Sequence, residues 1–147
     1  MKAKKISAKY VEWLNADDMH QASRSWISEL KFIKDEQLFL EDLIKVYTLQ
    51  LIDSENFSKS KGIVEVLKKL QKKNKALIKT IVIHENKLQV MVDGIDEPQK
   101  EEAYKDKHRE LIIIISKYLK DYRKLKKKLF EVVKSAMKKE KQKLLLK

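Results

Sequence analysis

The sequence predicts an all-α protein folded as an up-down-up antiparallel three-helix bundle with long helices. Two Gly and one Pro in 147 residues leave few turns. Charged residues make up 38% of the chain, and good helix formers dominate its composition. Apolar residues recur at alternating steps of three and four along three long segments, which is the spacing of one coiled-coil stripe on a helix. Such a stripe needs partner helices to cover it, so the three segments are expected to pack together.

The first segment is expected to begin after an N-terminal tail. Residues 1–16 show no long period and are expected to contain at most a short helix. Asp18 and Gln21 have the spacing of a capping box, so the first long helix is expected to start at Asp18. Residues 53–61 are rich in Ser and Asn, which favours a turn or a cap there. The stripe of the first helix comprises Met19, Ala22, Trp26, Leu30, Ile33, Gln37, Leu40, Ile44, Tyr47 and Leu51.

The second and third helices are expected to meet at a turn around Gly94. The second helix should end at Asp93 and Gly94, because Gly readily adopts the left-handed conformation that ends helices. Asp96 can cap the third helix, and Pro98 fits its first turn, where a missing amide is harmless. The second stripe comprises Ile63, Leu67, Leu70, Asn74, Leu77, Ile81, His84, Leu88, Met91 and Ile95. The third comprises Tyr104, His108, Leu111, Ile115, Tyr118, Tyr122, Leu125, Leu129, Val132 and Ala136.

Short connections make consecutive helices antiparallel. Residues 17–135 are therefore expected to form the bundle, and residues 136–147 a basic extension of the third helix that overhangs it. Antiparallel helices bring one stripe residue from each helix to the same level, and two of these layers contain histidine. One layer comprises Leu30, His84 and Leu111, and the next comprises Trp26, Leu88 and His108. The arrangement resembles spectrin-like bundles in architecture, although the chain shares no motif with them.

Polar side chains interrupt the three stripes. His84 and His108 have carboxylates nearby, and two His with a carboxylate is a ligand set of metal sites in bundle cores. The candidate metal ligands are His84, His108, Glu29, Glu85 and Glu110. The Glu-x-x-His pair of di-iron bundles is absent, so the favoured interpretation is structural, with a buried His paired to a Glu setting helix register. On that interpretation no cofactor is expected, and a divalent metal is the alternative.

The remaining polar and aromatic stripe residues are interpreted as structural. Gln37 and Asn74 are expected to set register. Tyr104, Tyr118 and Tyr122 are expected to lie in the core with hydroxyls that reach the bundle surface. His20, near the start of the first helix, has no comparable neighbours on the expected offsets.

Charge is distributed unevenly along the chain. The net charge of +12 includes −4 over residues 17–53 and +10 over residues 98–147. From residue 123 onwards the third helix has an apolar face and a lysine-rich face, the pattern of a helix that lies on an anionic surface or fills a partner's groove. One Arg among many Lys, without aromatics spaced for base stacking, argues against sequence-specific nucleic-acid readout. The candidate interaction residues are Lys124, Lys126, Lys127, Lys128, Lys134, Lys138, Lys139, Lys141 and Lys143.

Motifs for catalysis are missing from the sequence. Gly62 and Gly94 are the only glycines, which excludes a Gly-rich phosphate loop, and the serines have no neighbouring His to act as base. The chain has no Cys, so it has no thiol nucleophile, thiolate metal site or disulfide. An enzyme is therefore not expected, and a metal-dependent activity is the only route to one.

The leading hypothesis is a non-catalytic interaction or scaffold protein that acts through an unknown protein partner or through self-association. The basic N-terminus has no apolar run behind it, and the longest apolar run, residues 111–115, is far below the ~20 residues that cross a bilayer, so a cytoplasmic protein is expected. Two alternatives remain: a metal-binding bundle, and nonspecific binding of anionic membranes or nucleic acid through the third helix. No small-molecule substrate is inferred.

Overall fold

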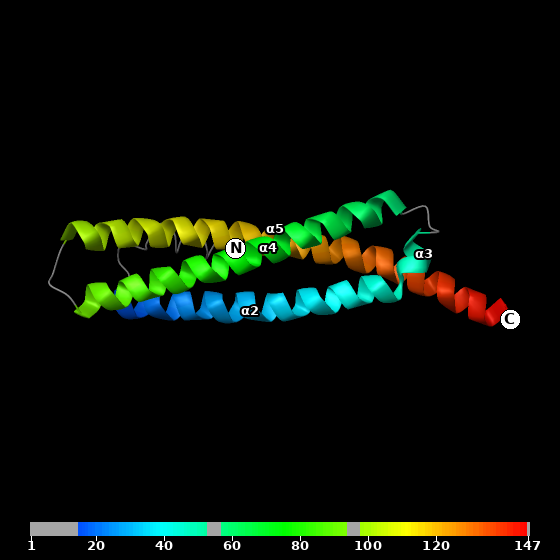
Figure 1. Cartoon of the computed structure of the whole chain (residues 1–147), viewed down its shortest axis with the longest axis horizontal. Coiled ribbons are helices and arrows are strands. Elements are labelled where there is room, and N and C mark those ends of the chain that lie inside the picture. Colours follow the sequence, from blue (N-terminus) through cyan, green and yellow to red (C-terminus); the bar gives the residue numbers. More distant parts are fainter. Residues whose placement is uncertain (1–14, 53–56, 94–97, 147) are drawn as a thin grey trace.

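The computed structural model describes residues 15–52, 57–93 and 98–146. Over these ranges the chain forms four helices packed against each other and no strand, which confirms the all-α class. The helices are α2 (Ala16–Val46), α3 (Thr48–Ile52), α4 (Phe57–Asp93) and α5 (Pro98–Leu146). Figure 1 shows α2, α4 and α5 side by side along the long axis, with α3 at one end and the last turns of α5 extending past it.

Helix α2 starts earlier than the sequence suggested. The N-cap is Asn15, whose side-chain oxygen accepts a hydrogen bond from the backbone N–H of Asp18 at 2.8 Å. The expected capping box at Asp18 and Gln21 is therefore wrong. Asp17 and Asp18 instead lie in the first turn, where their negative charges face the positive end of the helix dipole.

A break at Tyr47 divides the expected first helix into α2 and α3. The Thr48 hydroxyl donates to the carbonyl oxygen of Ile44 at 2.9 Å, and a Thr hydroxyl bonded four residues back often bends a helix. The stripe itself continues across the break, because Leu51 in α3 is buried. Helix α4 then begins at Phe57, so residues 57–61 are helical and not part of a turn.

The other helix boundaries follow expectation. Helix α4 ends at Asp93 and α5 begins at Pro98. Gly94, Ile95 and Asp96 lie outside the described residues, as does the N-terminal tail of residues 1–14.

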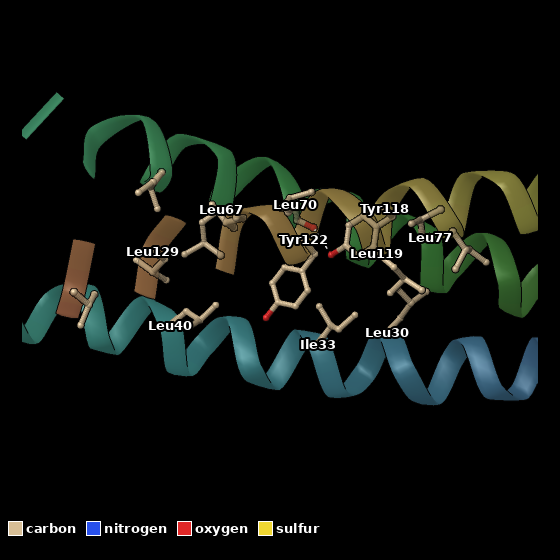
Figure 2. Close-up of a cluster of buried hydrophobic side chains, with 14 of the residues drawn as sticks. Leu30, Ile33, Leu40, Leu67, Leu70, Leu77, Tyr118, Leu119, Tyr122 and Leu129 are labelled. Atoms are coloured by element: carbon tan, nitrogen blue, oxygen red, sulfur yellow. Dashed lines mark hydrogen bonds between the residues drawn. The ribbon is translucent and has the colours of Figure 1, made fainter. Parts of the chain in front are cut away.

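The predicted stripes form the core. All ten stripe positions of α5 are buried, and so are the α4 positions from Ile63 to Leu88. The first predicted stripe, which follows α2 and its C-cap, is less completely covered, since Ala22, Trp26, Ile44 and Tyr47 are only partly buried. Figure 2 shows Leu30, Ile33 and Leu40 of α2 pointing towards side chains of the other two long helices.

The register between α2 and α4 differs from the expected offset. Asn74 Nδ2 donates to the carbonyl oxygen of Leu30 at 2.9 Å, whereas His84 was expected at the level of Leu30. Met19 likewise packs with Leu88 in a small cluster. The offset is wrong by two to three helical turns, because α2 ends at Val46 and α3 carries the chain on towards α4.

A buried polar network joins the three long helices. Tyr118 of α5 donates to the carbonyl oxygen of Leu70 in α4 at 2.9 Å and accepts from Gln37 Nε2 of α2 at 3.1 Å. Tyr118 is completely buried, and Figure 2 shows its hydroxyl directed towards Leu70. The expectation that this hydroxyl reaches the surface is therefore wrong, and it is also wrong for Tyr104, whose hydroxyl oxygen is buried. A hydroxyl with two buried partners does not need solvent.

Tyr122 behaves as the sequence suggested. Its hydroxyl donates to Glu36 Oε1 at 2.6 Å in a partly buried position, and Lys126 Nζ lies 2.9 Å from the same oxygen. Burial opposes ionisation of Glu36, but these two partners outweigh it and lower the pKa of the carboxyl. Tyr122 therefore links the core to a polar edge between α2 and α5.

The packed part of α5 extends further than residue 135. Ala136 is buried, and Glu140 accepts a hydrogen bond from Gln50 of α3 at 2.6 Å. Residues 141–146 are all exposed. The overhang is therefore shorter than the sequence suggested, because α3 covers part of it. In the described ranges, no helix combines the length and apolar character needed to span a membrane.

Candidate functional site

The two stripe histidines lie in direct contact near one end of the molecule. Nε2 of His84 in α4 is 3.0 Å from Nδ1 of His108 in α5, a hydrogen-bond distance. Their exposed fractions are 3% and 0%. The contact forms because each histidine occupies a core position of its stripe, and the α4–α5 register brings those positions to one level.

Aromatic rings enclose this pair. The Tyr104 ring stacks on His84 with centroids 4.0 Å apart and planes 3° from parallel. On the other side, Trp26 stacks on His108 at 4.8 Å. All three long helices thus contribute a ring to one layer, which we call the ring cluster: Trp26, His84, Tyr104 and His108. Flat rings at these distances stack favourably and keep bulk water away from the imidazoles.

The ring cluster keeps both imidazoles neutral. Burial lowers the pKa of His84 to about 4, and positive charge at His108, Lys107 and Lys87 lowers it further. Burial likewise lowers the pKa of His108 to about 4. Burial also raises the pKa of the Tyr104 hydroxyl well above its usual range. At pH 7 the cluster is therefore uncharged, because burial disfavours the charged form of each side chain.

The structure brings together the two histidines of the predicted metal site but not its carboxylates. Glu85 pairs with His20 across α2 and α4. Glu110 is exposed and lies 3.6 Å from Lys107 Nζ, and Glu29 is exposed on α2. Across residues 15–52, 57–93 and 98–146, no group of three or more His, Asp and Glu side chains could hold a metal ion.

The pairing of His20 with Glu85 was missed from the sequence. The level predicted for α2 against α4 puts His20 beside the end of α4, about two turns from Glu85. On that prediction His20 has no neighbours comparable to those of His84 and His108. One oxygen of Glu85, Oε2, is buried and accepts no hydrogen bond within the described part of the chain. The pair ties the start of α2 to α4 beside the ring cluster.

The predicted interaction lysines differ in their surroundings. Lys126 is engaged with Glu36, and its ammonium lies 5.1 Å from the centroid of the Tyr122 ring. Lys124 and Lys128 line a groove between α4 and α5. The others are exposed along α5 and its end: Lys127, Lys134, Lys138, Lys139, Lys141 and Lys143. The nine residues therefore do not form a single surface.

The groove lined by Lys124 and Lys128 has a volume of about 640 Å³. Its floor is apolar. Helix α4 contributes Lys59, Lys69 and Lys73, which are not among the interaction lysines predicted from the sequence. A second hollow of about 590 Å³ lies between the same two helices beside the ring cluster. The two hollows share no lining residue, and we call the pair of them the outer groove. Its lysines are Lys59, Lys69, Lys73, Lys87, Lys100, Lys107, Lys124 and Lys128.

The two hollows lie on one side of α4. Their α4 residues include Lys59, Val66, Lys73, Ile83 and Val90. Successive members are seven or ten residues apart, which are sums of steps of three and four. Positions with that spacing share a helix face. The core stripe predicted from the sequence does not include this second, mixed stripe beside it.

A second apolar stripe, which the core stripe does not predict, lies on the outside of α2. Phe32, Phe39 and Val46 recur every seven residues and have exposed fractions of 66%, 58% and 70%. Asp35 and Asp42, both exposed, lie between them at the same spacing. We call these five residues the α2 stripe. The repeat of seven is present in the sequence, but the core stripe of the same helix predicts only its buried face.

Comparison of this chain with protein-family models, with curated proteins and with solved structures gave no match in any of the three.

Proposed function

We propose that this chain is a non-catalytic helical interaction protein that acts through protein contacts or self-association. The proposed architecture is an up-down-up bundle of the three long helices, with α3 as a short addition at the end of α2. The observation that carries the proposal is the α2 stripe, in which three exposed apolar side chains repeat every seven residues on the outside of the helix.

The chemistry of the α2 stripe supports a contact with another protein. Single exposed apolar residues are normal on a protein surface, whereas large apolar residues repeated along one helix face form a row that another helix can cover. Two Phe and one Val repeat at the heptad spacing that helices use to pack on other helices. The neighbouring carboxylates would make the contact selective for a basic partner surface.

The ring cluster supports a non-catalytic role. His84 and His108 contact each other directly and are buried and neutral at pH 7, and of the two only His84, which is 3% exposed, borders a hollow. A general acid or base has to reach its substrate within hydrogen-bond distance. Rings stacked on both imidazoles favour a structural purpose, which is to pin the α2, α4 and α5 register at this end.

The proposal predicts that a charge placed in the α2 stripe disrupts the contact without unfolding the chain. Phe39→Lys is the variant, and Ile113→Lys is its control, since Ile113 is 63% exposed on α5 and lies outside both the stripe and the outer groove. Size-exclusion chromatography with light scattering, together with crosslinking in cell extract, would follow assembly. We expect Phe39→Lys alone to lose it. A strictly monomeric wild-type protein with no crosslink that depends on Phe39 would contradict the proposal.

Three expectations from the sequence stay predictions. The cytoplasmic location needs imaging of the tagged protein in its native cells. The metal-binding alternative needs metal analysis of protein purified without a His tag, together with melting on addition of divalent metals. Binding of anionic membranes or nucleic acid needs flotation and retention assays at two salt concentrations, because phosphate binding weakens steeply with salt.

A further inference from the structure

We infer that the α2 stripe of one copy lies in the outer groove of a second copy. This inference rests on the proposed function and names the partner: this same chain. The two surfaces carry opposite charge and share apolar character, which is the complementarity that steers specific association.

The outer groove has the chemistry to receive an acidic, apolar helix. In its larger hollow, five lysines surround a floor that includes Ile63, Val66, Leu70 and Leu125, with Asp121 as the only carboxylate in the lining. Val66 is itself 44% exposed on that floor. Gly62 opens the groove further, because an added Cβ there would meet no atom within 4 Å. A helix could therefore approach α4 closely at this point.

The α2 stripe has the matching pattern. Its Phe and Val side chains would meet the apolar floor, and Asp35 and Asp42 would face the lysine rims. Apolar positions of the outer groove also repeat at seven, as in Ile83 and Val90. Equal heptad spacing on both sides lets the side chains of one helix interdigitate with those of the other two.

Contact within one chain is excluded by the packing. The opposite face of α2, with Leu30, Ile33 and Leu40, is buried against the other long helices, so the α2 stripe points away from them. No residue of α2 is found in the lining of either hollow. The stripe and the groove therefore lie on opposite sides of the molecule, and only a second copy can bring them together.

This placement determines the kind of assembly. A copy whose groove is filled still presents its own stripe, so the contact is heterologous and can be repeated from copy to copy. The α2 stripe runs from Phe32 to Val46, about 21 Å along a helix about 10 Å across, so its footprint is on the order of 200 Å² per partner. That is below the size of a stable specific interface, so the contact between two copies is weak. We expect assembly that dissociates on dilution and weakens in salt.

Two double variants test the two surfaces separately. Phe39→Lys with Asp42→Lys breaks the stripe, and Lys73→Glu with Lys124→Glu breaks the groove; all four side chains are exposed. The control is Lys134→Glu with Lys139→Glu, two exposed lysines outside the groove. In sedimentation velocity over a concentration series, each broken variant should self-associate at least about tenfold more weakly than wild type and than the control.

Mixing the two broken variants is the decisive measurement. The stripe variant keeps an intact groove and the groove variant keeps an intact stripe, so the mixture should form a 1:1 complex of twice the chain mass and nothing larger. Circular dichroism of each variant should match wild type, which would establish that a monomeric variant is still folded.

Three outcomes would overturn the inference. If the groove variant assembled as wild type does, the stripe would contact another stripe, and the proposed function would survive. If wild type were monomeric but a Phe39-dependent partner were crosslinked, the function would again survive without self-association. If Lys73 and Lys124 were needed for retention of duplex DNA but not for assembly, the groove would be a site for polyanions.

Discussion

His84 Nε2 and His108 Nδ1 lie 3.0 Å apart inside the protein, and both imidazoles are neutral at pH 7. Protonation of either ring would put a positive charge among aromatic side chains, and no carboxylate of the described residues raises the pKa of either histidine. The histidine pair therefore links the stability of the fold to pH.

Stability should fall as the pH is lowered from about 6.5 to about 4. Burial lowers the pKa of both histidines to about 4, while the unfolded chain titrates near 6.5, so the unfolded state binds more protons in this window. At about 1.4 kcal/mol per pKa unit, the loss is several kcal/mol for the pair. Urea unfolding at a series of pH values measures it, and His84→Leu with His108→Leu should give a much flatter profile. Equal slopes for the two proteins would contradict this prediction.

The proton arrangement in the pair can also be predicted. Nε2 of His108 is buried and has no hydrogen-bond partner within the described part of the chain, whereas His84 borders the outer groove. A buried N–H without an acceptor is rarer than a buried bare acceptor. We expect His108 to carry its proton on Nδ1 and donate to His84. Long-range ¹⁵N–¹H correlation spectra at pH 7 distinguish the tautomers, and a protonated Nε2 on His108 would show the reverse arrangement.

Replacing Tyr118 by Phe should destabilise the fold by about 1–3 kcal/mol, because the amide of Gln37 is left buried without its partner. Adding Gln37→Leu to Tyr118→Phe removes the second polar group as well and should restore part of the loss. Chemical denaturation of the two variants measures this difference. A double variant less stable than Tyr118→Phe would mean that the shape of Gln37, and not its polarity, matters here.

Gly62→Ala should stabilise the protein by about 1 kcal/mol, since Gly is unfavourable inside a helix and the added Cβ meets no atom within 4 Å. For a chain of this size the melting temperature should rise by about 3 °C. Ala76→Gly, at an exposed position of the same helix, is the matched control and should lower the melting temperature by a similar amount. An unchanged or lower melting temperature for Gly62→Ala would contradict the prediction.

The helix stripes were predictable because a period of three and four is a property of each segment alone. Every stripe position of α5 is buried, including His108. The level at which helices face each other was not predictable in the same way, because it depends on the connection. The break at Tyr47 changes the level at which α2 lies against α4. Glu85 therefore pairs with His20 of α2 and not with the two core histidines.

The candidate site was predictable only in part. Histidines in two core stripes have to point inward, and only residues 94–97 separate their helices, so the meeting of His84 and His108 followed from local patterns. The carboxylates lie beside the core stripes, where their side chains turn towards nearby positive charges. Glu110, for example, pairs with Lys107. The α2 stripe follows a second apolar repeat, on the exposed face of a helix whose buried face already has a repeat of three and four.

The six residues after Glu140 are helical, yet every one of them is exposed. Their shape therefore depends on backbone hydrogen bonds alone, which open far more easily than a packed core. Trypsin should cut at Lys141 and Lys143 well before it cuts within the rest of α5. Brief digestion should thus trim the chain to a protease-resistant fragment with its melting temperature unchanged.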